Sequence, residues 1–284
     1  MGKIPPTTFS FFLKLRYNQA GTSTAGVVVP FLLNSLLGRY GFRTTLRIWA
    51  ITILMLSTPL IYFLRPRLPA SSISQPPRYG LRFLSSTSFW ILQACLMIES
   101  LGYFLPSIYL PTFARSLGLS AGMGSVLIAL LNGSAVFATI IMGMLCDRLH
   151  VTTVILISTI GATSAVFVFW GLSTTLPLLC IFAMLYGFFA GGFVSTNAGV
   201  IKLVKWQDQS VDTGMLLGVI RAGRGIGSLL SGPLSELLLR QRSWEVNVSG
   251  AGYGSKYESL ILFTGLTAAV GGLSFLGKRL GWIQ

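Results

Sequence analysis

Two adjacent runs of this sequence carry no charged side chain over lengths that a soluble helix does not need. The first extends from Ala121 to Cys146 and the second from Val151 to Thr175. A helix of about 20 apolar residues spans the hydrocarbon core of a bilayer. Within lipid, every backbone polar group must find its partner inside the segment, which a helix achieves. The two runs therefore predict membrane-spanning helices.

Further segments of the same character predict an all-α polytopic membrane protein with about eight transmembrane helices. The approximate spans are 20–38, 46–64, 88–113, 121–146, 152–173, 177–200, 213–239 and 258–276. The first span is the weakest, because Gly21, Gly26 and Pro30 interrupt it. Charged residues make up 10% of the chain and its mean hydropathy is +0.73. Soluble domains carry about 25% charged residues, so lipid is the expected surrounding of most of this chain.

The connections between the spans predict how the chain is divided. Residues 65–86 are rich in proline, serine and arginine, a composition that favours a solvated linker over a packed core. This linker separates residues 1–64, with two predicted helices, from residues 87–284, with six. The connections at 147–150 and 173–176 are short, so the helices that they join must run antiparallel.

The basic residues indicate an orientation rather than a nucleic-acid partner. The formal net charge is +14, from 21 lysines and arginines against 7 acidic residues. The basic residues lie between apolar runs, which is typical of loops that face anionic lipid headgroups. Most of them fall on the side of the 65–86 linker, which predicts that both termini are cytoplasmic, in the plasma membrane or an internal membrane. This orientation places a cluster of basic residues on the outside, against the charge rule: Arg39, Arg43 and Arg47. It also places the glycosylation sequon at 247–249 on the outside, where glycosylation is possible.

The sequence offers little for catalysis or metal binding. Cys95, Cys146 and Cys180 lie in apolar segments without metal-ligand spacing, and His150 is the single histidine of the chain. A membrane-embedded enzyme would need such residues clustered at the membrane face. We therefore expect neither an enzyme nor a cofactor nor a metal site. The glycine-rich run at 223–227 lies in an apolar span without a preceding strand, so it is not a dinucleotide-binding loop.

Four ionisable residues stand out inside the predicted spans. Glu99 lies in the third span, Arg221 and Arg224 lie near the middle of the seventh, and Glu236 lies near the outer end of the seventh. A charge within lipid is energetically costly and is a functional candidate by default. The two arginines are three positions apart and share a helix face, which must point into the bundle. Their partner is either a carboxylate such as Glu99 or an anionic substrate, because arginine binds both oxygens of a carboxylate. A structural ion pair between helices is the alternative.

Neutral polar residues in the spans have two possible roles. They either line a substrate path or form hydrogen bonds between helices, and most such residues do the latter. Asn132 and Tyr103 are the candidates for substrate contact, whereas Gln93, Asn197 and Tyr109 are weaker candidates.

Proline and glycine positions predict local helix geometry. Pro106 and Pro111 in the third span predict a kink, because proline removes a backbone hydrogen bond. Small residues spaced by four allow helix backbones to approach closely in lipid. This spacing occurs at the glycine pairs 187/191, 214/218 and 223/227.

One short motif resembles a known family. The segment from Gly143 to Asp147 and Arg148 resembles the G-x-L-x-D-R element of major facilitator transporters. In that family the element lies in cytoplasmic loops between the second and third helices and between the eighth and ninth. Three further stretches resemble fungal members of the monocarboxylate porter-like branch: residues 21–30, 65–69 and 222–236. The resemblance covers about residues 20–280.

The resemblance implies a numbering for the helices. With the G-x-L-x-D-R element between helices eight and nine, the eight predicted spans become helices 5–12 and residues 65–86 become the central loop. Residues 1–64 are then the remnant of an N-terminal half that lacks helices 1–4, and residues 87–284 are the C-terminal six-helix half. The element itself has a structural role and ties helices together at the cytoplasmic face.

The resemblance also implies a function. It implies transport of a small organic solute, a monocarboxylate being the first candidate, by alternating access of the two halves across the bilayer. A proton is the implied coupling ion, with Glu99 as its carrier. The candidate residues for substrate contact are Arg221, Arg224, Asn132 and Tyr103.

Two features depart from the pattern of the family. Half of the substrate cavity is absent if helices 1–4 are missing, so a truncated, non-transporting member of the family is the alternative. Thr139 stands where many porters of this branch carry a carboxylate-binding arginine. Arg221 or Arg224 would then have to replace that arginine.

Overall fold

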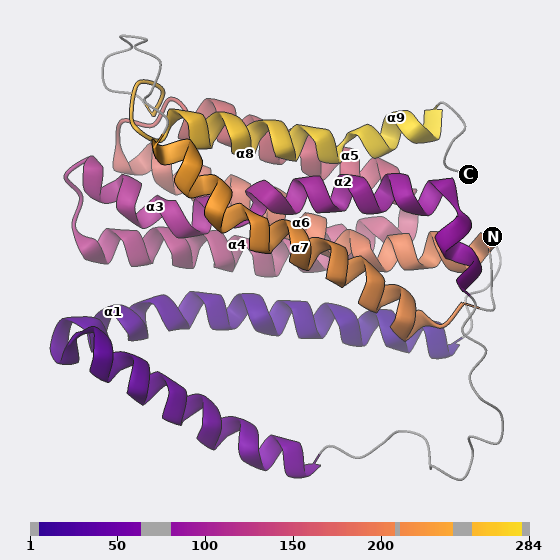
Figure 1. Ribbon diagram of the computed structural model, residues 1–284, viewed down its shortest axis with the longest axis horizontal. Helices are drawn as coiled ribbons and strands as arrows, with labels where there is room; N and C mark the ends of the chain where they lie inside the picture. Colours follow the sequence, from indigo (N-terminus) through magenta and orange to yellow (C-terminus); the bar gives the residue numbers. More distant parts are fainter. Residues whose placement is uncertain (1–5, 64–80, 208–210, 241–251, 280–284) are drawn as a thin grey trace.

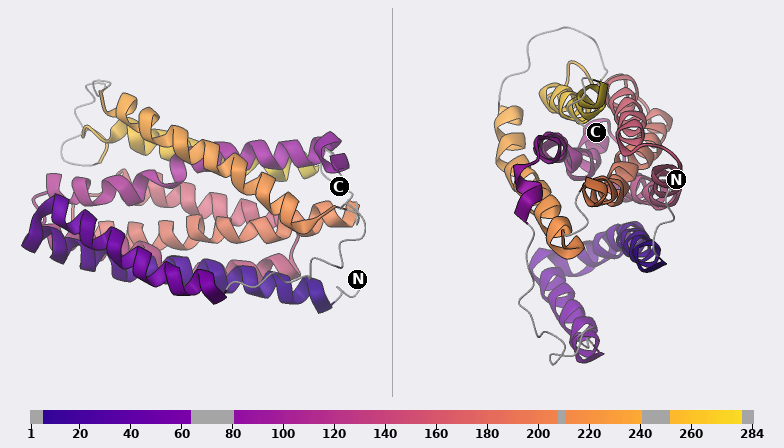
Figure 2. Two further views of the ribbon diagram at one scale, coloured as in Figure 1. Left: turned by 60° about the horizontal axis from the view of Figure 1, so that its bottom comes forward. Right: turned by 90° about the vertical axis from the view of Figure 1, so that its right-hand side faces the viewer.

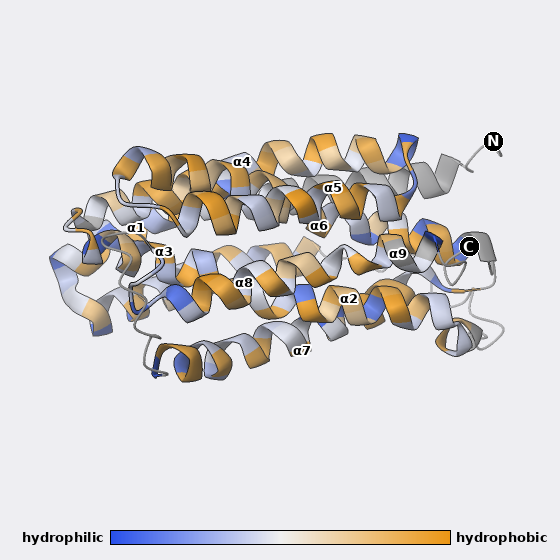
Figure 3. Cartoon of the chain, turned by 90° about the horizontal axis from the view of Figure 1, so that it is seen from above, coloured by the Kyte–Doolittle hydropathy of each residue, from blue (hydrophilic) through white to orange (hydrophobic). Residues whose placement is uncertain are grey.

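The chain folds into an elongated bundle of helices. The computed structural model describes residues 6–63, 81–207, 211–240 and 252–279, and every regular element in these ranges is a helix. The helices lie side by side along the long axis of the molecule (Figure 1). Hydrophobic residues cover most of the helical surface, and hydrophilic residues gather toward the helix ends (Figure 3). The predicted all-α membrane fold is confirmed.

The element bounds show where single spans are interrupted. In chain order the described elements are α1 (Pro6–Phe63), η2 (Leu81–Ser85), α2 (Thr87–Tyr103), α3 (Leu105–Ser116), α4 (Ala121–Arg148), α5 (Val151–Ser164), η3 (Ala165–Trp170), α6 (Leu176–Gln207), α7 (Thr213–Arg240), α8 (Glu258–Gly271) and α9 (Leu273–Arg279). The short element η2 is a 3-10 helix and η3 is a π-helix. Three spans consist of two elements each, namely α2 with α3, α5 with η3, and α8 with α9.

Six helical segments of the described chain are long and apolar enough to cross a membrane. Together they overlap every predicted span except the one at 213–239, with differences of one to three residues at some ends. That span coincides with α7, which is helical at the predicted place but more polar than the other six. The first two predicted spans fall into one segment, Gly21–Phe63.

Helix α1 differs from the prediction in its start and in its break. It begins at Pro6, ahead of the predicted start, and neither Gly21 nor Gly26 nor Pro30 interrupts it. The chain instead turns back at Gly41, which has φ 71° and ψ 175° (Figure 1). This left-handed conformation favours glycine, because a Cβ atom would be strained there. Pro30 is thus accommodated within the helix, as prolines are in transmembrane helices. The positive φ of Gly41 sets the position of the break.

The two halves of α1 have different surroundings. The first half packs against α4, where a Cβ atom on Gly26 would lie 2.5 Å from Asn132 Oδ1. The second half diverges from the bundle, as the end-on view shows (Figure 2). Most of its large apolar side chains are exposed, and Leu54, Met55 and Tyr62 are 65%, 70% and 85% exposed.

Glycines allow close helix packing at two of the three predicted places. A Cβ atom on Gly191 of α6 would lie 2.6 Å from the Cβ of Ala135 on α4. One on Gly227 of α7 would lie 2.5 Å from the carbonyl oxygen of Met97 on α2. The pairs 187/191 and 223/227 are therefore confirmed as packing sites. The prediction for the pair 214/218 is wrong, because nothing lies within 4 Å of a Cβ atom on Gly218.

The predicted kink in the third span is a break between α2 and α3 at Phe104. Pro106 has no N–H group to donate to the carbonyl of Gly102, so the hydrogen-bond ladder is interrupted there. Next to the break, the carbonyl of Tyr103 accepts a hydrogen bond from the Tyr186 hydroxyl of α6 at 3.1 Å. The break therefore joins the middle of this span to a neighbouring helix.

The short connections lie where the sequence predicts them. Leu149 and His150 join α4 to α5, and His150 Nδ1 accepts a hydrogen bond from the backbone N–H of Thr152 at 3.3 Å. Of the predicted linker at 65–86, residues 81–85 form η2. Residues 65–80 and the sequon at 247–249 lie outside the described residues.

Candidate functional site

A polar cavity of about 420 Å³ lies between α1, α2, α4, α6 and α7, near the middle of the helices. Its polar lining comes from all five helices and consists of Thr22, Ser23, Tyr103, Asn132, Asn197, Arg221, Arg224 and Ser228. The structure thus brings together the four residues that the sequence singles out for substrate contact. It also places the two arginines on one face of α7, as their spacing predicts.

Arg224 forms an ion pair across the bundle. Its Nη2 lies 3.4 Å from Oε2 of Glu99 on α2, and the side chains are 12% and 7% exposed. The two charges are close, but neither Oε2 of Glu99 nor Nη1 of Arg224 has a hydrogen-bond partner among the described residues. Glu99 therefore supplies the carboxylate expected for one arginine. The guanidinium keeps an unpaired N–H group at a residue that lines the cavity.

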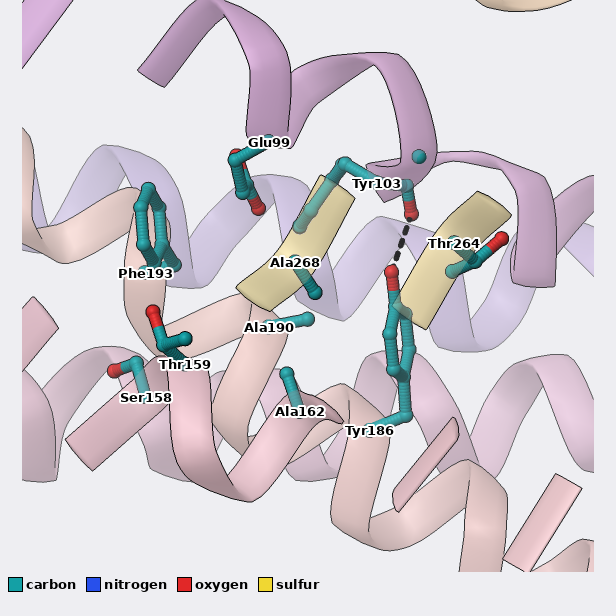
Figure 4. A pocket seen from close by; sticks show the side chains of 11 residues that line it. Glu99, Tyr103, Ser158, Thr159, Ala162, Tyr186, Ala190, Phe193, Thr264 and Ala268 are labelled. Atoms are coloured by element: carbon teal, nitrogen blue, oxygen red, sulfur yellow. Dashed lines mark hydrogen bonds between the residues drawn. The ribbon is translucent and has the colours of Figure 1, made fainter. Parts of the chain in front are cut away.

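Tyr103 lies beside the ion pair. The Arg224 guanidinium carbon lies 5.1 Å from the centre of the Tyr103 ring, within the range of a cation–π interaction. The same tyrosine lines both the polar cavity and a small space in front of Glu99. The close-up shows Tyr186 bonded to its backbone (Figure 4). Tyr103 is thus held in place from α6 while its ring contacts α7.

Arg221 and the two asparagines complete the cavity wall. Arg221 is exposed, and no ion pair to it is found within the described ranges. Asn132 donates to the carbonyl of Ile128 on its own helix at 3.0 Å. Asn197 is 2% exposed, and its Oδ1 has no partner among the described side chains. Two residues that line the cavity, Arg224 and Asn197, thus each carry a buried polar atom without a hydrogen-bond partner among the described residues.

Sequence reasoning gave some of these residues too little weight. Asn197 was a weaker candidate than Asn132, yet both line the cavity. Ser23 of α1 was not a candidate at all. The available signal was the run of small hydroxyl residues in the first span, which also contains Thr22 and Thr24.

Two other polar residues position α7 rather than line the cavity. Gln93 of α2 donates to the carbonyl of Val219 at 3.3 Å. Tyr109 of α3 shares a hydrogen bond of 2.9 Å with Ser235. Both interactions hold α7 against the third span and so fix the face that carries the arginines.

The three motif positions lie apart from the cavity. Asp147 and Arg148 are in the last turn of α4, about 22 Å along the helix from Asn132 at 1.5 Å per residue. Gly143 is one turn earlier in the same helix. Thr139 is buried and donates to the carbonyl of Ala135 at 2.7 Å. It does not belong to the lining of the polar cavity.

The sequence model of the Major Facilitator Superfamily matches residues 17–201 and, in a second alignment, residues 94–281. The chain belongs to the Major Facilitator Superfamily. It is therefore an integral multi-pass membrane protein of a family whose members carry small molecules. Transporters of this kind place substrate and ion sites near the bilayer midplane, and the polar cavity is lined by residues near the middle of its helices.

Curated relatives in this superfamily are fungal. The aspyridones efflux protein apdF of Emericella nidulans is 29% identical over 227 residues, which are 78% of this chain and 45% of the relative. The MFS transporter asaE of Aspergillus flavus is 25% identical over 90% of this chain and 55% of its own length. The agnestins efflux protein of Paecilomyces divaricatus is 25% identical, over 92% and 56% respectively. The chain spans about half the length of these relatives.

Proposed function

We propose that this chain provides the substrate site of a secondary transporter that moves a small organic anion across a membrane by alternating access. The observation that carries the proposal is the pair Arg221 and Arg224 in one cavity at mid-depth. Two guanidinium groups in that place need anionic partners. Glu99 neutralises one of them, so one positive charge remains for a substrate. Asn197 and Asn132 add hydrogen-bonding groups that orient it.

The size of the cavity favours a larger solute over a short monocarboxylate. Cavities of about 300–1,000 Å³ hold drug-sized ligands, and this one measures about 420 Å³. Thr139 also occupies the position of the carboxylate-binding arginine found in many monocarboxylate porters. The names of two relatives report efflux of aspyridones and agnestins. We therefore propose export of a multi-ring or long-chain organic acid, with a monocarboxylate as the simpler alternative.

The ion pair suggests how a proton is coupled to transport. The carboxylate of Glu99 and an anionic substrate compete for Arg224, because both bind the same guanidinium. When Glu99 takes up a proton, its charge disappears and Arg224 becomes available to the substrate. When Glu99 releases the proton, it competes again and favours substrate release. Glu99 is therefore the proposed proton carrier.

The proposed arrangement in the membrane follows the helix numbering. Residues 1–64 contribute two helices of an N-terminal half, residues 65–86 the central loop, and residues 87–284 the C-terminal half. The end of the bundle that carries Asp147 and Arg148 faces the cytoplasm together with both termini, in the plasma membrane or an internal membrane. The G-x-L-x-D-R element stabilises that end.

Efflux from cells that express the full chain tests this function. Cells are loaded with radiolabelled organic acids of increasing size, from acetate to a multi-ring aromatic carboxylate, and release is measured for the parent chain and for Arg224→Gln. A hydrogen bond to a charged group contributes about 1.5–3 kcal/mol. We therefore expect Arg224→Gln to slow release of the larger acids at least about tenfold.

Arg115→Gln is the matched control, because it removes the same charge from an exposed position near the end of α3. Its release rates should stay within about twofold of the parent. Equal losses in both variants would argue against a role of Arg224 in binding. No release by the correctly inserted parent chain would instead support the non-transporting alternative.

A further inference from the structure

A small side chamber adjoins the polar cavity. It measures about 70 Å³. Helices α4 and α6 supply most of its lining, and α1, α2 and α3 supply the rest. The chamber and the polar cavity share four lining residues: Ser23, Tyr103, Phe104 and Asn132. A ligand in the polar cavity can therefore extend into the chamber.

Close helix contacts fix the shape of the chamber. A Cβ atom on Gly191 of α6 would lie 2.6 Å from the Cβ of Ala135 on α4, and both residues line the chamber. The hydroxyl of Tyr186, also on α6, donates to the carbonyl of Tyr103 at 3.1 Å (Figure 4). The walls from α2, α4 and α6 are thus joined to one another, so the chamber is preorganised for a ligand.

The chamber suits a compact apolar group. None of the described residues that line it is charged, and Leu131 and Ala190 add apolar surface. Two of its polar side chains are already paired, because Asn132 donates to a carbonyl of its own helix at 3.0 Å and Tyr186 donates to Tyr103. An apolar cavity of about 150 Å³ binds benzene, so a cavity of about half that volume holds roughly three carbon atoms.

Tyr103 connects the chamber to the arginines. The centre of its ring lies 5.1 Å from the guanidinium carbon of Arg224, and Tyr103 lines both the chamber and the polar cavity. An anion bound by Arg224 therefore lies next to a residue of the chamber wall. A group that enters the chamber must then be attached close to the anionic end of the ligand.

We propose that the chamber binds a short alkyl branch on the carbon next to the carboxylate of the substrate. This inference rests on the proposed function and names the substrate class, an organic acid that is branched beside its acidic group. Such a substrate is held at three places: its carboxylate at Arg224, its branch in the chamber and the rest of its skeleton in the polar cavity. Three different contacts around one carbon atom distinguish its mirror-image forms, so one enantiomer binds more tightly.

Competition binding to the purified full chain tests this inference. Radiolabelled naphthylacetate, which is unbranched, is the tracer. The competitors are the two enantiomers of its derivative with an isopropyl group on the carbon next to the carboxylate. Burying one methylene group changes a binding constant about fourfold. Because an isopropyl group has three carbon atoms, we expect the affinities of the two enantiomers to differ at least about tenfold.

Filling the chamber should abolish this preference. Ser107→Leu places a larger side chain on the α3 wall, so the two enantiomers should bind equally while the affinity for naphthylacetate stays within about twofold. Ser107→Ala removes only the hydroxyl group and should keep the preference. Thr112→Leu is the matched control, because Thr112 is exposed on the same helix and is not part of the chamber lining. Ala190→Val fills the chamber from α6 and should repeat the result if Ser107→Leu does not fold.

The outcomes separate this inference from the proposed function. Equal affinities of the two enantiomers for the parent chain, with naphthylacetate bound, would overturn the branch site and leave the proposed function standing. A preference that persists in both filled variants would overturn it as well. Tighter binding of an acid with a hydroxymethyl branch than of the same acid with an ethyl branch would contradict the apolar class. No binding of naphthylacetate to the parent chain would contradict the proposed function, and the inference would fail with it.

Discussion

Arg224 is the residue where three interactions meet. It pairs with Glu99 at 3.4 Å, lies over the ring of Tyr103 at 5.1 Å, and lines the polar cavity. Glu99 balances its charge, which a cation within lipid requires, and the ring of Tyr103 adds a cation–π contact. A structural ion pair would need only the contact with Glu99. On the proposed function, the position of Arg224 in the cavity wall lets it exchange Glu99 for a substrate anion.

Breaking the pair from either side should destabilise the protein. Glu99→Gln and Arg224→Gln each leave one buried charge without its partner, which costs about 3–5 kcal/mol. In the double variant the two losses should overlap, with a coupling of about 0.5–3 kcal/mol. Unfolding by a denaturing detergent in mixed micelles measures all four proteins. Strictly additive losses would mean that the two side chains do not interact in the folded state.

At the scale of helices, the contact between α2 and α7 decides whether the arginine face reaches the cavity. α7 crosses the bundle obliquely (Figure 1). Its contact with α2 is close because Gly227 meets the α2 backbone and Gly223 meets the side chain of Gln93. The hydrogen bonds of Gln93 and Tyr109 to α7 fix its rotation. The close contact between α2 and α7 and the rotation of α7 together place the two arginines in the wall of the polar cavity.

Two glycine substitutions on α7 should have opposite effects on stability. Gly227→Ala would bring a methyl group to 2.5 Å from the Met97 carbonyl, and overpacking costs about 1–3 kcal/mol. Gly225 has open space around it, so Gly225→Ala should be neutral or stabilise the helix by up to about 1 kcal/mol. Thermal denaturation in detergent compares the two variants. Equal effects would show that the α2–α7 contact is looser than described.

The helices were largely predictable because the thickness of the bilayer sets the length of each apolar run. α4 ends two residues beyond its predicted span, and α6 starts one residue before its span and ends seven residues beyond it. The course of α1 was not predictable for two reasons. A proline such as Pro30 can lie inside a transmembrane helix, and the break depends on the backbone conformation of Gly41. The π-helix η3 also depends on tertiary structure, where the hydroxyl of Tyr253 donates to the carbonyl of Phe167 at 2.8 Å.

The candidate site was predictable where residues are charged. A charge in an apolar span is rare, so Glu99 and the two arginines stood out from the sequence alone. Asn197 and Ser23 did not, because amides and hydroxyls are common in spans and most of them join helices. Which of them face a cavity depends on helix rotation, and packing rather than composition sets that rotation.

At the scale of the whole molecule, the helix ends form two opposite faces. Arg148 of α4 and Arg279 of α9 lie near one end, and the turn after α3 lies at the other (Figure 1). The excess of lysine and arginine on the first face predicts that it is cytoplasmic. The bundle thus has one expected orientation in the membrane.

Cysteine labelling in intact cells tests this orientation. In a chain whose native cysteines are replaced by alanine, Ser120→Cys should react with a membrane-impermeant maleimide. Leu149→Cys should react after the cells are permeabilised, because it lies in the turn on the opposite face. Both positions are exposed, so the side of the membrane on which each cysteine lies decides whether the maleimide reaches it. The reverse pattern would assign the opposite orientation.

The second half of α1 stands apart in what it requires of its side chains. Its apolar side chains touch little of the rest of the described chain, so contacts within this chain place few demands on their shape. Hydrophobicity and length, which govern insertion into the bilayer, are all that the described contacts require of this stretch. The helices around the polar cavity differ, because each of them constrains the side chains of its neighbours directly.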